Sequence, residues 1–329
     1  MNIYDVAEYA GVSVATVSRV INNTDKVREK TRKKVEDAIK ELNYFPNDVA
    51  RALASSKTNY IGIMVGNIRN YFDNQSAYQL ERNLKDHDIV SILCNTSDYD
   101  EEKIDYLKVL REKKVDGIIT VGSTYGEKDF LETVKDLDIP AVMINVLDDI
   151  KGDKLAYVCC DEVNAMEKSL EFFKKKGYKK PLLISRDKGY QTRASINKQA
   201  GFIKGLKKYF PDVDLLEVNV KDVKEEVDEI IKLIKRENID IIQFEVDKLA
   251  LKFYKEFYKR GIRIPEDVAM CGFDNEDSTN FTNKRISSID QRIDMQAKIA
   301  VDTLLGISLG EDFDRVNMVK AQLVQKETI

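Results

Sequence analysis

Two apolar stripes that meet at a glycine are the feature that most constrains how the beginning of this chain folds. Each stripe has the spacing of one helix face, with Val6, Ala7 and Ala10 in the first and Val17, Val20 and Ile21 in the second. Gly11 lies between them, where a residue that tolerates positive φ can end a helix. Ser13 is then placed to cap the next helix through its hydroxyl group. The pattern predicts two short helices joined by a tight turn.

Helix, tight turn and helix is the helix-turn-helix arrangement, in which the second helix enters the major groove of DNA. The outward positions of the expected second helix hold small, polar and cationic side chains: Val14, Ala15, Ser18, Arg19 and Asn22. Arginine can bond bidentately to guanine, and small apolar groups can contact a thymine methyl group. The hydroxyls of Ser13, Thr16 and Ser18 suit phosphate oxygens. Taken alone, the pattern also fits an ordinary helical hairpin with a solvated face.

Four short segments of this region resemble the head of the LacI/GalR family of bacterial repressors. They are YDVA at 4–7, AGVS at 10–13, TVSRVIN at 16–22 and LNYxPN at 42–47. The resemblance implies that Val14, Ala15 and Arg19 select the operator. It extends the expected DNA contacts to the set Tyr4, Ser13, Val14, Ala15, Thr16, Ser18, Arg19, Asn22, Lys26, Asn47, Ala50 and Leu53.

A third helix is expected from about Glu29 to Leu42, because Val35, Ala38, Ile39 and Leu42 form a further apolar stripe. Pro46 ends that region, and residues 47–54 contain good helix formers for only two turns. A helix this short forms only against a partner. A plain linker is the alternative. The family resemblance implies a hinge helix that pairs with its dimer mate in the minor groove, where Leu53 wedges between bases.

The charge of the chain is distributed unevenly. Residues 1–58 hold ten Lys and Arg against eight Asp and Glu, a net charge of +2, although the whole chain of 329 residues carries −4. Six of these cations and one anion fall within residues 26–34. A charge run is usually a solvated helix face. Beside a recognition helix it is better explained as a phosphate-neutralising surface, which makes DNA binding salt-dependent.

The rest of the composition argues against other protein classes. Cys94, Cys159, Cys160 and Cys271 lie in apolar runs without a Cys-x-x-Cys pair, which indicates buried free thiols. The single histidine, His87, is expected at the surface, so no metal site and no cofactor are predicted. No apolar run approaches membrane-spanning length and no signal peptide is recognised, so a cytoplasmic location without membrane contact is expected.

From residue 60 the pattern becomes an alternation of apolar strands and amphipathic helices. Strands are expected at Ile61–Val65, Ile89–Cys94, Val115–Val121, Ala141–Val146, Tyr157–Cys160, Leu182–Ser185, Leu215–Val220, Ile239–Phe244 and Val268–Phe273. The clearest helices are Glu162–Lys176, Thr192–Tyr209, Val223–Arg236 and Asp247–Arg260. Continuous apolar strands of this kind form parallel sheets covered on both faces. The fold class is therefore α/β, with two doubly wound lobes, a cleft at the carboxyl ends of their strands and a small all-α head in front.

The segments 116–119, 261–268 and 272–274 also resemble the family, and the core is similar to periplasmic sugar-binding proteins. The resemblance implies a head at 1–45, a hinge at 46–58 and a two-lobed core at 59–329. The N-lobe comprises about 59–160 plus 291–318, and the C-lobe comprises about 161–290 plus 319–329. Because no leucine heptad follows residue 325, a homodimer is expected rather than a tetramer.

By the same resemblance, Asn145, Lys198 and Asp274 are the expected effector-binding residues. The set departs from the family pattern. Lys198 stands where arginine is common, Asn145 where aspartate often binds sugar hydroxyls, and Val246 where asparagine is usual. Lysine does not reproduce the guanidinium fork, and valine cannot hydrogen-bond a ligand. The usual sugar site is therefore altered: either the ligand differs from a simple sugar, or there is none.

The favoured interpretation is a dimeric, sequence-specific transcriptional regulator of the repressor type. Its expected partners are double-stranded operator DNA and a small-molecule effector, a sugar or sugar derivative such as a sugar phosphate. Whether the effector acts as inducer or corepressor is left open. A solute-binding module without regulatory DNA binding is the alternative, but it predicts an export signal and no DNA head. An enzyme is disfavoured: no catalytic residues are identified and no phosphate loop is present.

Overall fold

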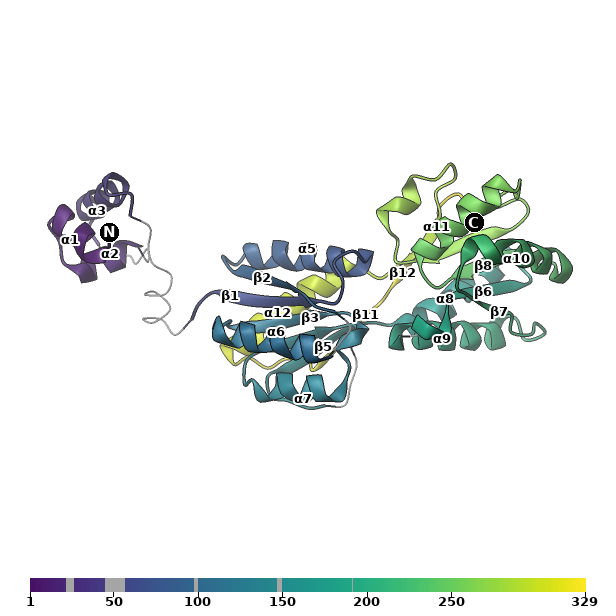
Figure 1. The fold of residues 1–329 in the computed structure, drawn as a ribbon, viewed down its shortest axis with the longest axis horizontal. Coiled ribbons are helices and arrows are strands. Elements are labelled where there is room, and N and C mark those ends of the chain that lie inside the picture. Colours follow the sequence, from purple (N-terminus) through teal and green to yellow (C-terminus); the bar gives the residue numbers. More distant parts are fainter. Residues whose placement is uncertain (22–26, 45–56, 98–99, 147–149, 191) are drawn as a thin grey trace. The chain divides into compact units, whose positions relative to one another are not determined.

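The computed structural model describes residues 1–21, 27–44, 57–97, 100–146, 150–190 and 192–329 (Figure 1). It contains two compact units, Met1–Thr58 and Asn59–Ile329. The expected DNA contacts Asn22, Lys26, Asn47, Ala50 and Leu53 lie outside the described residues, as does the expected hinge helix.

The first unit contains three helices around a small apolar core: α1 (Ile3–Ala10), α2 (Val14–Ile21) and α3 (Glu29–Glu41). Asn2 and Asp5 form a capping box at the start of α1, and Gly11 ends that helix with φ of 65°. The Ser13 hydroxyl accepts a hydrogen bond from the Thr16 N–H at 3.2 Å, which caps α2. The helix-turn-helix prediction and its caps are confirmed.

The core of this unit is built from the three predicted stripes and from Tyr44, which was not predicted. Its buried side chains are Val6, Ala7, Ala10, Val17, Val20, Val35, Ala38 and Tyr44. Val14, which was expected on the outward face, is half-exposed and also packs against this cluster. Helical side chains lean toward the N-terminus of their helix, and a first-turn valine can therefore cover the turn before it.

The second unit begins with a six-stranded sheet in the order β11-β5-β4-β3-β1-β2, in which every pair is parallel. Its strands are β1 (Tyr60–Val65), β2 (Val90–Asn95), β3 (Gly117–Val121), β4 (Ala141–Ile144), β5 (Leu155–Cys160) and β11 (Val316–Val319). One face is covered by α5 (Tyr71–Lys85) and α12 (Ile293–Leu309). The other is covered by α6 (Asp100–Glu112) and α7 (Lys128–Asp136).

The second sheet repeats this plan in the order β12-β10-β9-β8-β6-β7. Its strands are β6 (Pro181–Arg186), β7 (Glu217–Val220), β8 (Ile241–Phe244), β9 (Ala269–Phe273), β10 (Ser287–Asp290) and the antiparallel β12 (Gln322–Val324). One face is covered by α10 (Val223–Glu237) and α11 (Asp247–Lys259). The other is covered by α8 (Glu162–Lys176) and α9 (Arg193–Tyr209). Short 3-10 helices η1, η2 and η3 lie at Ser123–Tyr125, Lys188–Tyr190 and Asp277–Asn280.

Neighbouring residues of each central strand enter opposite cores. In β1, for example, Ile61, Ile63 and Val65 pack under α5 and α12, while Met64 packs under α6 and α7. Because both faces are buried, the strands read as unbroken apolar runs, which is why they could be predicted. The two doubly wound lobes expected from the sequence are confirmed.

The chain passes between the two sheets three times. It leaves the first sheet after Cys160, returns after Asp290 to form α12 and β11, and crosses again between Val319 and Gln322. The strands β10, β11 and β12 were not predicted. They are three or four residues long, and β11 and β12 are largely exposed, so their sequences lack the apolar run that marks the others.

The four cysteines are free and buried, and His87 is exposed, as expected. Among the described residues no group of His, Cys, Asp and Glu side chains could hold a metal ion. Within the same part of the chain no helix is long and apolar enough to cross a membrane.

Substitutions at Gly11 test the turn between α1 and α2. A Cβ atom there would meet nothing within 4 Å, so any cost comes from the positive φ alone. We expect Gly11→Ala to destabilise the first unit by about 1 kcal/mol. Gly11→Asn should cost less, because asparagine tolerates this conformation. Amide hydrogen exchange in α1 and α2 of the full chain measures both variants, and equal exchange rates in the two would contradict the conformational explanation.

Candidate DNA-binding face and effector cleft

The second helix of the first unit exposes the two side chains best suited to base contacts. Ala15 and Arg19 are exposed four residues apart, and they therefore lie on one face of α2. Ser13 is exposed and its hydroxyl lies 2.9 Å from that of Thr16. Thr16 and Ser18 are half-buried, whereas Tyr4 on α1 is 69% exposed. The face thus combines a cation, a methyl group and hydroxyls, the groups that contact bases and phosphates.

The second unit contains a cleft of roughly 930 Å³ at the carboxyl ends of its strands. Residues that directly follow strands of both sheets line it, including Gly66, Gly122, Asn145, Asp274 and Gln291. Because the strands that precede these residues are parallel within each sheet, their carboxyl ends lie at one edge of it, where ligands of doubly wound proteins bind. The volume is that of a small-molecule site.

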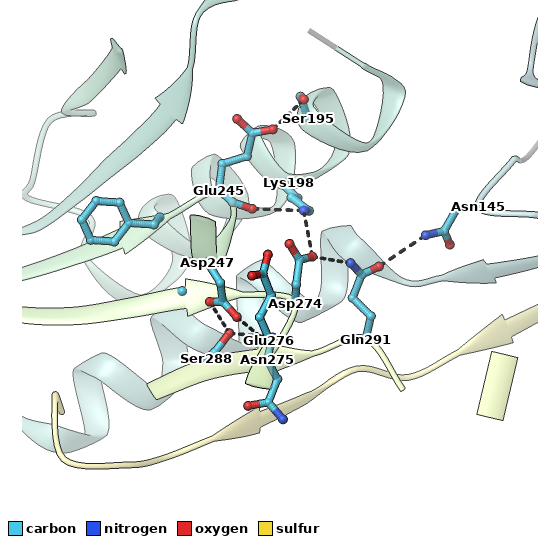
Figure 2. Close-up of polar contacts among 12 residues, drawn as sticks. Asn145, Ser195, Lys198, Glu245, Asp247, Asp274, Asn275, Glu276, Ser288 and Gln291 are labelled. Carbon is cyan, nitrogen blue, oxygen red and sulfur yellow. Dashed lines mark hydrogen bonds and ion pairs between the residues drawn. The ribbon is translucent and has the colours of Figure 1, made fainter. Parts of the chain in front are cut away.

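A chain of polar contacts runs across the floor of the cleft and includes all three predicted effector residues (Figure 2). The Asn145 Nδ2 donates to Gln291 Oε1 at 3.3 Å, and the Gln291 Nε2 donates to Asp274 Oδ1 at 2.5 Å. Asp274 Oδ1 lies 3.9 Å from Lys198 Nζ. Gln291 therefore links Asn145 of the first lobe to Asp274 of the second, and Asp274 in turn faces Lys198 of α9.

Lys198 is buried and its ammonium group is already engaged by the protein. Its Nζ donates to the Glu245 carbonyl oxygen at 3.0 Å and lies 3.8 Å from the centre of the Phe273 ring. The ammonium group also forms an ion pair with Asp274, so its charge is directed at groups of the protein. Lys198 therefore supports the floor of the cleft and positions Asp274.

Beside Lys198, the buried Glu245 carboxylate forms a second ion pair with Arg186, which is partly exposed. Arg186 donates to Glu245 Oε1 through its NH2 at 2.6 Å and its Nε at 3.1 Å, and the Ser195 hydroxyl donates at 2.7 Å. Burial acts to raise the pKa of this carboxyl group, but Arg186, Lys198 and Ser195 prevail and hold the pKa at about 2. The Glu245 carboxylate is thus fixed in its charged form.

Asp247, the first residue of α11, organises the loop after β9. Its oxygens accept hydrogen bonds from the Ser288 hydroxyl and from the Glu276 N–H, both at 2.7 Å. Complete burial, together with the charge of Asp274, raises its pKa well above the usual value. The preceding Val246 lines the cleft and presents an apolar wall there.

Tyr71 of α5 reaches from the first lobe to the second. Its hydroxyl donates to the Asn275 carbonyl oxygen at 3.5 Å. Burial, followed by the negative charges of Asp277, Glu276 and Asp290, raises its pKa to about 12, so the phenol stays protonated and remains a donor. Tyr71, Glu245, Arg186 and Gln291 were missed in the sequence. They carry no motif, and only their position next to strand ends could have indicated them.

Comparison with known proteins identifies the family. The model for "Bacterial regulatory proteins, lacI family" matches residues 2–47. The model for "Periplasmic binding proteins and sugar binding domain of LacI family" matches residues 58–327. The chain belongs to the LacI family. This LacI-family chain is a transcriptional regulator with a DNA-binding head and a ligand-binding core.

Individual relatives agree with this assignment. An HTH-type transcriptional regulator of Lachnoclostridium phytofermentans is 32% identical and covers 100% of this LacI-family chain and 99% of the relative. The fold is similar to that of the Lac repressor dimer bound to operator and the anti-inducer ONPF, with a TM-score of 0.84 and 22% identity. The match covers 100% of this chain and 98% of the Lac repressor chain. A further similar structure is that of a periplasmic binding protein/LacI transcriptional regulator from Alkaliphilus metalliredigens complexed with D-xylulofuranose. It is 28% identical with a TM-score of 0.66, and the match covers 82% of this chain and 98% of that protein.

Acid titration of unfolding tests the buried Glu245 pair. The pKa of this carboxyl falls from 4.5 to about 2 in the folded state, so its stabilising contribution is complete above pH 4.5 and is lost as the pH falls to about 2. The drop corresponds to about 3 kcal/mol. We expect the difference in unfolding free energy between wild type and Glu245→Gln to shrink by about that amount over this pH range. A constant difference would contradict the ion pair.

Gly272→Ala tests the Asp247 anchor. A Cβ atom at Gly272 would lie 1.8 Å from Asp247 Oδ1, so either the carboxylate or strand β9 must move. We expect a loss of about 3 kcal/mol in unfolding free energy, measured by urea denaturation. Gly306→Ala is the control. Gly306 lies within helix α12, and the nearest atom to an added Cβ is 3.5 Å away, so this substitution should stabilise the protein by roughly 0.5–1 kcal/mol. Equal effects of the two substitutions would disprove the steric argument.

Proposed function

We propose that the protein represses transcription as a homodimer that binds a pseudo-palindromic operator. One helix-turn-helix head per subunit reads one half-site, because a two-fold protein matches a two-fold DNA site. The observation that supports this most is a family-matched head whose second helix exposes Ala15 and Arg19 on one face. Arg19 contacts a guanine, Ala15 and Val14 contact neighbouring bases, and Tyr4, Ser13, Thr16 and Ser18 contact phosphates.

The remaining DNA contacts in this proposal come from segments outside the described residues. Asn22 and Lys26 contact the backbone next to the recognition helix. Asn47, Ala50 and Leu53 enter the minor groove, where Leu53 wedges between base pairs and bends the duplex. The supporting observation is the similarity of residues 2–47 to the family head. We divide the chain accordingly into a head at 1–45, a hinge at 46–58 and the two-lobed core, with lobes at about 59–160 plus 291–318 and 161–290 plus 319–329.

We further propose that the cleft binds a small effector, a sugar or sugar derivative, through Asn145, Lys198 and Asp274. The cleft volume and the ring of amide and carboxylate groups support a polyhydroxylated ligand. The Alkaliphilus relative was crystallised with a sugar, D-xylulofuranose. Here Asn145 and Asp274 contact the ligand, and Lys198 acts by orienting Asp274.

The effector regulates DNA binding by favouring one relative arrangement of the two lobes. The shift it produces is limited by its differential affinity for the two arrangements. Because the operator is chromosomal DNA, we place the protein in the cytoplasm. We assign it no catalytic activity, in line with relatives that are named as regulators.

Arg19→Ala tests base reading by the head. We expect a loss of about 1–3 kcal/mol on the cognate operator and relaxed selectivity at one base pair, measured by fluorescence anisotropy on a set of single-base variants. Lys30→Ala in α3 is the matched control. It should weaken binding to all duplexes alike and reduce the salt dependence, because it removes a phosphate contact. Unchanged selectivity in Arg19→Ala would refute the assignment.

A further inference from the structure

Glu162 is a buried carboxylate that lines the cleft and has no assigned role. It is the first residue of α8 and is 5% exposed. Its Oε2 accepts a hydrogen bond from the Asn197 Nδ2 at 2.9 Å. Within the described part of the chain, its Oε1 accepts no hydrogen bond, although the residue borders the cleft. A buried side chain therefore presents an unused acceptor to the cavity.

Two cations, Arg186 and Lys198, lie beside the carboxylates Glu245 and Asp274 at the cleft floor. Arg186 neutralises Glu245 at 2.6 Å, and Lys198 faces Asp274 at 3.9 Å. Lys198 also acts on Glu162 electrostatically, but its single charge is shared between two carboxylates. These two cations face three carboxylates, Glu162, Glu245 and Asp274, so this group carries one negative charge in excess. The remaining cations that line the cleft, Arg69, Lys248 and Lys252, are exposed to solvent.

An uncompensated buried charge is costly and is normally paired. Burial raises the pKa of Glu162, as expected for a carboxylate that lacks a full counter-charge, and Asn197 and Lys198 only partly oppose the shift. A ligand hydroxyl could bond the free Oε1, but it would leave the charge in place. A ligand ammonium group would satisfy the acceptor and cancel the charge together, and such charge-assisted bonds are roughly twice as strong.

We propose that the effector carries a cationic amino group and that Glu162 is its counter-ion. This inference rests on the proposed effector role of the cleft and narrows the ligand to amine-bearing polyols, of which amino sugars are the simplest class. The hydroxyls of such a ligand meet Asn145 and Asp274, and its amine enters on the side of α8. Glu162 is then a specificity-determining residue that separates amines from neutral sugars.

Matched ligands test the proposal on the full-length protein. D-glucosamine, D-galactosamine and D-mannosamine are each compared with the parent hexose and with the N-acetyl derivative, at about pH 6.5, where the amines are protonated. Thermal shift and isothermal titration calorimetry measure binding. We expect at least one amine to bind tenfold or more tightly than both of its neutral counterparts. Equal or tighter binding of a neutral counterpart overturns the proposal, as does the absence of binding by any amine.

A charge-removing variant provides the second measurement. Glu162→Gln keeps the size of the side chain and an acceptor for Asn197, so we expect unchanged or higher thermal stability without ligand. We also expect loss of the preference for the amine. Glu171→Gln on the same helix is the control, because Glu171 pairs with Lys168 and Lys175 and does not line the cleft. A retained amine preference in Glu162→Gln, or a clear loss of its unliganded stability, overturns the proposal.

Operator binding distinguishes this inference from the proposed function. Anisotropy of an operator duplex is measured with each ligand of the panel. If a neutral sugar alone alters operator affinity, the effector role of the cleft stands and the amine proposal fails. If the protein shows no preference for any duplex over random competitor, the proposed function fails, whatever the calorimetry reports.

Discussion

Burial of parallel strands on both faces is the constraint from which the rest of the core follows. Residues such as Ile63 and Met64 enter opposite cores, so most positions within the central strands are apolar. Polar groups are consequently concentrated after the strands, and parallel pairing brings those ends to one edge. Asn145, Glu245, Asp274 and Gln291 all occupy such positions. The cleft is thus a direct result of the way the sheets are built.

The electrostatics of the cleft follow from the same burial. Charges that leave water must be paired, and here the pairs are formed within the protein: Arg186 with Glu245, and Lys198 with Asp274. Lys198 stands where arginine is common in the family, and the two side chains make different contacts. A guanidinium group could hold several ligand oxygens, whereas this ammonium group is held by a carbonyl oxygen, a carboxylate and the Phe273 ring.

The sequence predicted this fold well where a periodic pattern existed. The stripes of α1, α2 and α3 were recognised because burial of one helix face imposes a fixed spacing, and the strands up to Phe273 because burial of both faces makes them continuous apolar runs. The strands β10 to β12 were missed because they are short and lack an apolar run: β10 has the sequence SSID, and β11 and β12 are partly exposed. In the site, Asn145, Lys198 and Asp274 were identified through the family resemblance and lie in one polar chain. Gln291 and Glu162 could not be identified, because their importance depends on contacts between segments far apart in the sequence.

The three crossings between the sheets limit how the core can deform. Each lobe has its own closed set of apolar contacts, while the links after Cys160, after Asp290 and after Val319 lie beside one another at the paired strands β5 and β11 and at β10 and β12. Three short links anchored in this way resist separation of the two lobes and sliding of one lobe past the other. Bending of one lobe toward the other is the motion that these links restrict least. A displacement of a few ångströms at the links therefore becomes a larger displacement at the far ends of the lobes.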